Sequence, residues 1–242
     1  MSLLAIRGAS KRFGGLAAND DISFSVEKGE IVGLIGPNGA GKSTLFNLIA
    51  GYYPMTSGVI EFLGAPVSGL PPEEICRRGI ARTFQIVRIF RGMTVLENVM
   101  VGAFLRSPGR RDAEGAAREV LARVGLSARA DAAAMSLTVS EQKRVQLARA
   151  LATRPTLLLL DEAMAGLNPQ ETAEAVALIR SIREDGVTMI IVEHVMEVIM
   201  PISDRVVVLD YGKKIAEGAP KEIIRNERVI AAYLGEKRRA AH

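Results

Sequence analysis

The chain has 242 residues, of which 48% are hydrophobic and 24% are charged, a composition typical of a folded globular protein. This length suits one domain with a subdomain. The formal net charge of +4 permits a nucleic-acid or membrane-surface partner but does not require one. The longest apolar runs, at 157–160 and 189–192, fall far short of the roughly 18 residues that a membrane-spanning helix needs.

Two further features of the composition indicate a cytoplasmic protein. The first residues, MSLLAIRGASKRF, lack the charged start and apolar middle of a signal peptide. The single cysteine, Cys76, can form no disulfide within the chain, which suits a reducing compartment. Because no histidine stands near it in PPEEICRR, we interpret Cys76 as a packing residue and not as a nucleophile.

Short β-branched runs alternate with helical patterns along the chain, which predicts an α/β layered domain. The expected strands are 3–7, 22–26, 30–35, 59–62, 80–84, 157–161, 187–192, 205–209 and 214–216. The expected helices are 42–50, 72–78, 95–105, 112–124, 140–152, 169–184, 195–202 and 221–225. The strands at 30–35, 157–161 and 187–192 are nearly all apolar, as is typical of strands buried on both faces of a parallel sheet.

The pattern also indicates two regions beside the main sheet. Residues 21–26 alternate polar and apolar side chains and lead directly into the next strand, which favours an antiparallel β region. Residues 92–153 contain helical patterns and no good strand, with loops expected at 109–112 and 128–134. We therefore predict one domain over 1–242, with an α/β core at 1–91 and 154–242 and an inserted helical subdomain at 92–153.

The strongest motif is a glycine-rich loop, GPNGAGKST, between an expected strand and an expected helix. It matches the phosphate-binding pattern G-x-x-x-x-G-K-[ST]. Its glycines let backbone N–H groups converge on an anion, and the helix start adds a positive dipole end. The residues expected to bind ATP are Gly36, Pro37, Asn38, Gly39, Ala40, Gly41, Lys42, Ser43 and Thr44. Lys42 is expected to reach the β- and γ-phosphates, and the Ser43 hydroxyl is expected to bind Mg²⁺.

A second motif, TLLLLDEA at 156–163, is an apolar strand that ends in two carboxylates. Asp161 at the strand end is expected to hold Mg²⁺, and Glu162 to polarise the attacking water. Alone, two such carboxylates could equally cap a helix. The phosphate-binding loop elsewhere in the chain favours the catalytic interpretation.

Two further polar residues follow expected strands. His194 comes after VTMIIV, at the edge of the sheet where ligands of parallel sheets bind, so it is a candidate for contacting the γ-phosphate or holding the attacking water. An isolated histidine is more often a packed or surface residue. Gln85, after GIARTF, has little meaning on its own.

Taken together, residues 3–236 resemble an ATP-binding-cassette (ABC) ATPase. The resemblance implies that Phe13 stacks on adenine and that Gln85 meets Mg²⁺ and the attacking water. It further implies that 165–168 form the loop after the catalytic Glu162, and that His194 is the switch histidine. The expected fold is therefore a P-loop NTPase, with an ABC ATPase core, an antiparallel β subdomain and an inserted α-helical subdomain.

The family signature, ideally LSGGQ, is the main departure. Here that place holds LTVSE at 137–141, followed by QKRVQLARAL. The resemblance implies that Thr138 and Ser140 contact a nucleotide held by a second subunit. Thr138 keeps a hydroxyl, but the β-carbon of Ser140 is expected to crowd a close approach of the backbone to phosphate. The alternative is an ordinary capped helix with Ser140 as its cap.

Longer stretches resemble one subfamily, the ATPase subunits of branched-chain amino-acid importers (the hydrophobic amino-acid uptake family). They are RTFQIVRIFRGMTVLENVMVGA, DEAMAGLNPQET, ISDRVVVLDYGKKIAEGAP and AAYLGE. This resemblance implies a head-to-tail dimer with an identical or paralogous ATPase subunit, at the cytoplasmic face of the inner membrane. The implied partners are polytopic permeases and, indirectly, a solute-binding receptor, with no nucleic acid.

The resemblance also implies how the chain meets a permease. The apolar side chains of Ile86, Val87, Ile89 and Phe90 are expected to form a groove for a short helix of a membrane subunit, although the same side chains could instead pack against the helical subdomain. Two alternative functions of the protein stay open. One is a soluble ABC-type ATPase that acts on nucleic acid or ribosomes, and the other is an exporter ATPase for lipid or lipopolysaccharide.

Overall fold

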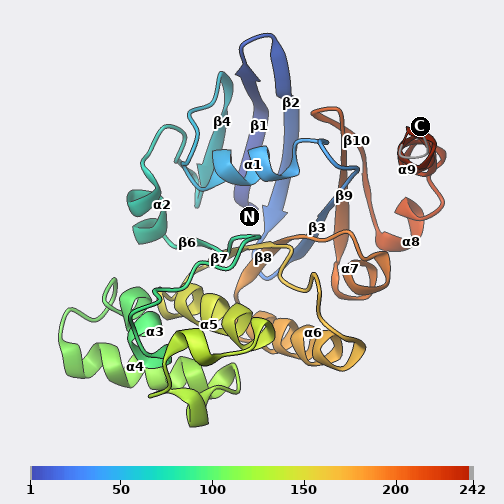
Figure 1. Ribbon diagram of the computed structural model, residues 1–242. Coiled ribbons are helices and arrows are strands. Elements are labelled where there is room, and N and C mark those ends of the chain that lie inside the picture. The colour runs from blue at the N-terminus through green and yellow to red at the C-terminus, as the bar shows by residue number, and fades with distance from the viewer. Residues whose placement is uncertain (1, 240–242) are drawn as a thin grey trace. The chain divides into compact units, whose positions relative to one another are not determined.

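The computed structural model describes residues 2–239, with side chains described for residues 2–233 (Figure 1). Within these residues the chain forms two compact units. The first unit contains residues 2–75 and 188–239, and the second contains residues 76–187. The predicted single domain of 1–242 includes residues 1 and 240–242, which lie outside the described range, and its division at 92–153 stays a prediction.

The first unit contains an antiparallel sheet in which β1, β2 and β4 run side by side (Figure 1). Its strand order is β2-β1-β4-β5, formed by β1 (Ser2–Phe13), β2 (Leu16–Glu27), β4 (Ser57–Phe62) and β5 (Ala65–Pro66). The predicted antiparallel β region is therefore confirmed. Both β1 and β2 are longer than the sequence predicted, because register shifts around Gly8, whose φ is +60°, interrupt the alternation.

The first unit also contains a mostly parallel group of strands in the order β10-β9-β3-β8. These are β3 (Ile31–Ile35), β8 (Thr188–Val192), β9 (Arg205–Asp210) and β10 (Lys213–Gly218). β3 is parallel to both β8 and β9, whereas β10 is antiparallel to β9. Every residue of β3 and β8 is buried, as their apolar sequences predicted.

Short helices complete the first unit. They are α1 (Lys42–Ile49), α7 (Met196–Ile202), α8 (Pro220–Ile223) and α9 (Glu227–Arg239), while α2 (Pro72–Arg78) crosses into the second unit. Neither α9 nor the two-residue strand β5 was predicted. In residues 2–239, no helix combines the length and the apolar character that crossing a lipid bilayer requires.

The second unit pairs two parallel strands, β6 (Ile80–Arg82) and β7 (Leu157–Asp161). Its helices are α3 (Val95–Ala103), α4 (Arg110–Arg123), α5 (Val139–Ala152) and α6 (Pro169–Glu184). α3, α4 and α5 lie together (Figure 1), as the helical pattern of 92–153 predicted. The loop expected at 109–112 is mostly the first turn of α4, which begins at Arg110.

The contact between α3 and α5 depends on Gly102. A β-carbon at this position would lie 2.1 Å from the carbonyl oxygen of Arg149 and 3.3 Å from the Ala152 β-carbon. The backbones of the two helices therefore approach each other too closely for any side chain at position 102. Gly115 of α4 offers a contrast, because a β-carbon there meets no atom within 4 Å.

We predict that Gly102→Ala lowers the free energy of unfolding by about 1–3 kcal/mol, because the new methyl group overpacks the helix contact. The matched change Gly115→Ala should raise it by up to about 1 kcal/mol, because alanine is the better helix former. Urea unfolding followed by circular dichroism measures both. Equal effects of the two substitutions would contradict the close approach at Gly102.

Candidate functional site

The glycine-rich loop leaves the end of β3 and enters α1 in the first unit. All three of its glycines have conformations that other residues rarely adopt, with φ +149° at Gly36, +77° at Gly39 and +99° at Gly41. A β-carbon at Gly36 would lie 2.1 Å from the Leu209 carbonyl oxygen, and one at Gly41 would lie 2.4 Å from that of Ala18. The sequence therefore needs glycine at both ends of the loop for steric reasons.

The loop is tied to two neighbouring segments by hydrogen bonds. The buried Asn19 of β2 donates its side-chain Nδ2 to the Gly41 carbonyl at 3.1 Å. The backbone N–H of Gly212 donates to Ala40 at 3.1 Å, and its carbonyl accepts from Asp20 at 2.8 Å. Sequence reasoning missed both Asn19 and Gly212, because neither belongs to the loop motif. Hydrogen bonds from β2 and from the turn between β9 and β10 thus hold the loop in place.

The groups that would meet a phosphate are arranged at the start of α1. Lys42 is 7% exposed, and its Nζ donates to the carbonyls of Gly36 at 2.6 Å and Pro37 at 2.9 Å. The helix has no side-chain cap and no acidic residue in its first turn. Asn38, Gly39 and Ser43 are exposed. The loop thus presents a positive helix end and an ammonium group to an incoming anion.

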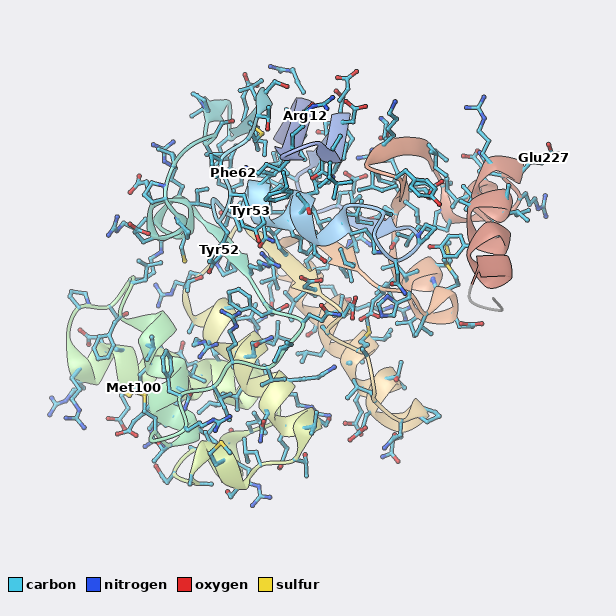
Figure 2. The ribbon with its side chains drawn as sticks, turned by 45° about the horizontal axis from the view of Figure 1, so that its top comes forward. Arg12, Tyr52, Tyr53, Phe62, Met100 and Glu227 are labelled. Atoms are coloured by element: carbon cyan, nitrogen blue, oxygen red, sulfur yellow. The ribbon has the colours of Figure 1, made fainter. Side chains whose placement is uncertain are left out.

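Phe13, the expected adenine contact, is the last residue of β1 and is 44% exposed. Its ring forms a T-shaped pair with that of Tyr53, with centroids 5.4 Å apart and an interplanar angle of 82°. Lys11 Nζ lies 5.0 Å from the Phe13 centroid. Figure 2 labels Tyr53 and also Arg12, the residue that precedes Phe13 in β1. Stacking on adenine stays a prediction for Phe13.

His194 lies at the edge of the sheet that the sequence predicted. β3 and β8 pair in parallel with Leu34 opposite Val192, so both strands end at the same edge. The phosphate-binding loop follows one strand, and the exposed His194 follows the other. Within the first unit, the predicted switch histidine and the loop therefore follow adjacent strand ends.

The second unit places the aspartate of the second motif in an ion pair. Arg82 Nη2 lies 2.9 Å from Asp161 Oδ2, and the two side chains are only 9% and 2% exposed. The Asp161 N–H also donates to the Thr83 hydroxyl at 3.1 Å. The ring of Phe84 lies 5.2 Å from the Arg82 guanidinium and 4.8 Å from that of Arg88. Sequence reasoning missed Arg82.

The structure brings Gln85 and Glu162 together. Gln85 follows β6, Glu162 follows the parallel strand β7, and Gln85 Nε2 donates to Glu162 Oε2 at 2.6 Å. This bond leaves the Gln85 amide oxygen available as a ligand. Glu162 has a φ of +48°, a conformation that is uncommon for a residue with a side chain and that is found more often at functional sites.

The signature segment starts α5 with a capping box. The Thr138 hydroxyl accepts from the Glu141 N–H at 3.2 Å, and Glu141 Oε2 accepts from the Thr138 N–H at 2.9 Å. The helix thus begins at Val139 with Thr138 as its cap, which corrects the expectation of Ser140 as the cap. Hydrogen bonding to Thr138, helped by Arg129 at 3.1 Å, lowers the pKa of Glu141 below its ordinary value.

These features define a P-loop nucleotide-binding protein in which a phosphate loop, an acidic strand end and a capped signature helix occur in one chain. The family model for ABC transporters matches residues 19–165, and a model for branched-chain amino acid ATP-binding cassette transporters matches residues 213–238. The chain belongs to the ABC transporter family. It has the ABC ATPase fold, and it is a nucleotide-binding ATPase of the transport-coupled kind.

Individual relatives match over nearly the whole chain. The ATP-binding protein LivG of Salmonella typhimurium, named for high-affinity branched-chain amino acid transport, is 44% identical over 97% of this chain and 98% of its own length. The corresponding protein BraF of Pseudomonas aeruginosa is 42% identical over the same shares.

Solved structures of ATP-binding cassettes also match this chain in fold. An ABC transporter cassette in its ADP conformation has a TM-score of 0.88 and 30% identity, covering 97% of this chain and 99% of its own. A dimeric cassette in a post-hydrolysis state with ADP and Pi has a TM-score of 0.82 and 25% identity, covering 90% and 98%.

We predict that Arg82→Met lowers the free energy of unfolding by about 3–5 kcal/mol, because it leaves the buried Asp161 carboxylate without its cation. Arg7→Met is the matched control. Arg7 pairs with Glu61 at 2.8 Å, but its side chain is 63% exposed, so its loss should cost at most about 1 kcal/mol. Chemical denaturation measures the free energy of unfolding of both variants. Similar decreases for Arg82→Met and Arg7→Met would contradict the prediction that the buried ion pair matters more.

Proposed function

We propose that this chain is the ATP-hydrolysing subunit of a membrane importer for branched-chain or related amino acids. The observation that carries the proposal is the 44% identity to LivG along nearly the full length of both chains. The match of residues 213–238 to a model specific to branched-chain amino acid cassettes supports it independently of the ATPase motifs. The proposed location is the cytoplasmic face of the inner membrane, as a peripheral subunit.

ATP binding is assigned to the first unit. Phe13 stacks on adenine, the backbone of Gly36–Thr44 surrounds the phosphates, and Lys42 leaves its carbonyl partners to meet the β- and γ-phosphates. The short hydrogen bonds of Lys42 to Gly36 and Pro37 support this role, because they hold the ammonium inside the loop that would receive the phosphate. His194 contacts the γ-phosphate.

Gln85 and Asp161 of the second unit are proposed as ligands of Mg²⁺, and Ser43 is proposed as a further ligand on the strength of its motif alone. Their hydroxyl, amide and carboxylate oxygens are the hard ligands that this ion prefers, and the bond from Gln85 Nε2 to Glu162 leaves the amide oxygen for it. When bound with ATP, the ion neutralises charge on the β- and γ-phosphates. Glu162 orients and polarises the attacking water, so catalysis is positioning plus electrostatic stabilisation.

The proposed working form is a head-to-tail dimer with an identical or paralogous ATPase subunit. In it, Thr138 and Ser140 at the start of α5 contact the nucleotide held by the mate. The solved cassette with ADP and Pi is dimeric, which supports a dimer as the working form. ATP then favours the closed dimer and hydrolysis favours the open one, so chemistry drives movement through a shift in population.

A groove for a permease helix is assigned to the segment after Gln85. Ile86 is 77% exposed and Phe90 is 44% exposed, an exposure that is unusual for large apolar side chains so close together. Two residues of α5 hold the segment in place. Gln146 accepts from the Arg88 N–H at 3.0 Å, and the Arg149 guanidinium lies 5.0 Å from the centroid of the Phe90 ring. Val87 and Ile89 belong to the same groove.

Purification of the tagged chain from native membranes tests the proposed function. Recovery with two polytopic permeases and a solute receptor, together with ATP-dependent uptake of leucine or valine by the reconstituted complex, is the expected result. Recovery with ribosomes or nucleic acid alone contradicts it in favour of a soluble ATPase. Recovery with a lipid or lipopolysaccharide export complex contradicts import.

We also predict that Ser140→Gly raises ATP turnover at saturating ATP, because it removes the β-carbon that stands where the family has glycine. The same change should lower the stability of α5 by about 0.5–1 kcal/mol. Ser140→Ala is the matched control, since it removes the hydroxyl but keeps the β-carbon, and it should give no gain. A steady-state ATPase assay measures both, and unchanged or reduced turnover in Ser140→Gly would refute the steric explanation.

A further inference from the structure

Lys143 connects the signature helix to the segment that follows β7. It lies on α5, one turn after the helix begins at Val139. Its Nζ donates to the carbonyl oxygens of Glu162 at 3.4 Å and Ala163 at 3.3 Å, and also to that of Ala165. A lysine ammonium has three N–H donors, so its donors match the three carbonyls of this one turn.

The turn that receives Lys143 is strained at its first residue. Glu162 has a left-handed backbone with φ +48°, which costs a residue with a side chain about 1–3 kcal/mol. Two backbone hydrogen bonds close the turn, from Ala165 to Glu162 and from Leu167 to Met164, both at 3.3 Å. Lys143 of α5 adds hydrogen bonds to the same turn. The strained conformation is therefore stabilised by a separate helix as well as by the turn itself.

Glu162 is thereby held at two points. Its carboxylate accepts from Gln85, while its backbone carbonyl accepts from Lys143. Gln85, Ser140, Lys143 and Glu162 also line one cavity of about 50 Å³ in the second unit. A cavity of this size leaves the Glu162 side chain room to shift if either point of support is lost.

We propose that Lys143 is a positioning residue for ATP hydrolysis, which holds the turn that carries Glu162 in register with the signature helix. This inference rests on the proposed function, in particular on Glu162 as the group that activates water. Because α5 also presents Thr138 and Ser140 to the mate's nucleotide in the proposed dimer, Lys143 transmits a movement of α5 at one nucleotide site to Glu162 at the other.

The test compares Lys143→Met with Lys143→Arg and with Arg144→Met, each in the full-length chain. Lys143→Met should lower kcat roughly 10- to 100-fold, the scale on which a misplaced catalytic group slows a reaction. Its Kd for a fluorescent ATP analogue and its melting temperature should match the wild type. Lys143→Arg keeps the donors and should restore most of kcat. Arg144→Met removes the neighbouring cation, which pairs with Glu174, and should leave kcat unchanged.

A double-mutant cycle separates positioning from a purely structural role. If Lys143 acts through Glu162, Lys143→Met should not lower the residual turnover of Glu162→Gln any further. An unchanged kcat in Lys143→Met, an additive loss in the double variant, or a parallel loss of nucleotide affinity and melting temperature each overturns the inference. Wild-type turnover in Glu162→Gln instead contradicts the proposed role of Glu162, and the inference with it.

Discussion

The nucleotide site depends on two backbone approaches that are closer than any side chain allows. The Leu209 carbonyl at the end of β9 reaches the place that a β-carbon would occupy on Gly36, and the Ala18 carbonyl of β2 does the same at Gly41. The loop therefore packs directly against the backbones of β2 and β9, and the backbone of Gly212 links the loop to β2 through Ala40 and Asp20. The antiparallel sheet of the first unit thus shapes the phosphate-binding loop directly.

Most of the fold could be predicted because burial and periodicity are local properties of a sequence. The nearly all-apolar strands β3, β7 and β8 were found where they were expected, and the polar residues that the sequence singled out directly follow β7 and β8. Gln85 and Glu162 were each expected to follow a strand, but neither the parallel pairing of β6 with β7 nor the hydrogen bond between the two side chains was predicted. The element ends were less predictable where bulges or capping, as at Gly8 and Thr138, decide them.

The residues that the sequence did not reveal act through long-range polar contacts. Arg82 pairs with Asp161, and Lys143 donates to the carbonyl of Glu162 in the turn that follows Asp161. In both cases the partner is distant along the chain. Asn19 similarly reaches Gly41 from another strand. No periodic pattern marks such residues, because their partners are set by tertiary packing. Charged side chains on helices and strands most often face solvent, so only the three-dimensional structure distinguishes Arg82 and Lys143 from surface charges.

The capping box at the start of α5 has a consequence for association. Val139 and Ser140 stand where the family has glycines, and on either side of them the side chains of Thr138 and Glu141 bond each other's backbone N–H groups, while Arg129 holds the Glu141 carboxylate. The first turn of the helix is therefore ordered in the single subunit. If a second subunit docks there, as proposed, less conformational entropy remains to be lost on binding. Closure of the proposed dimer would then depend more on shape complementarity than on the ordering of a loop.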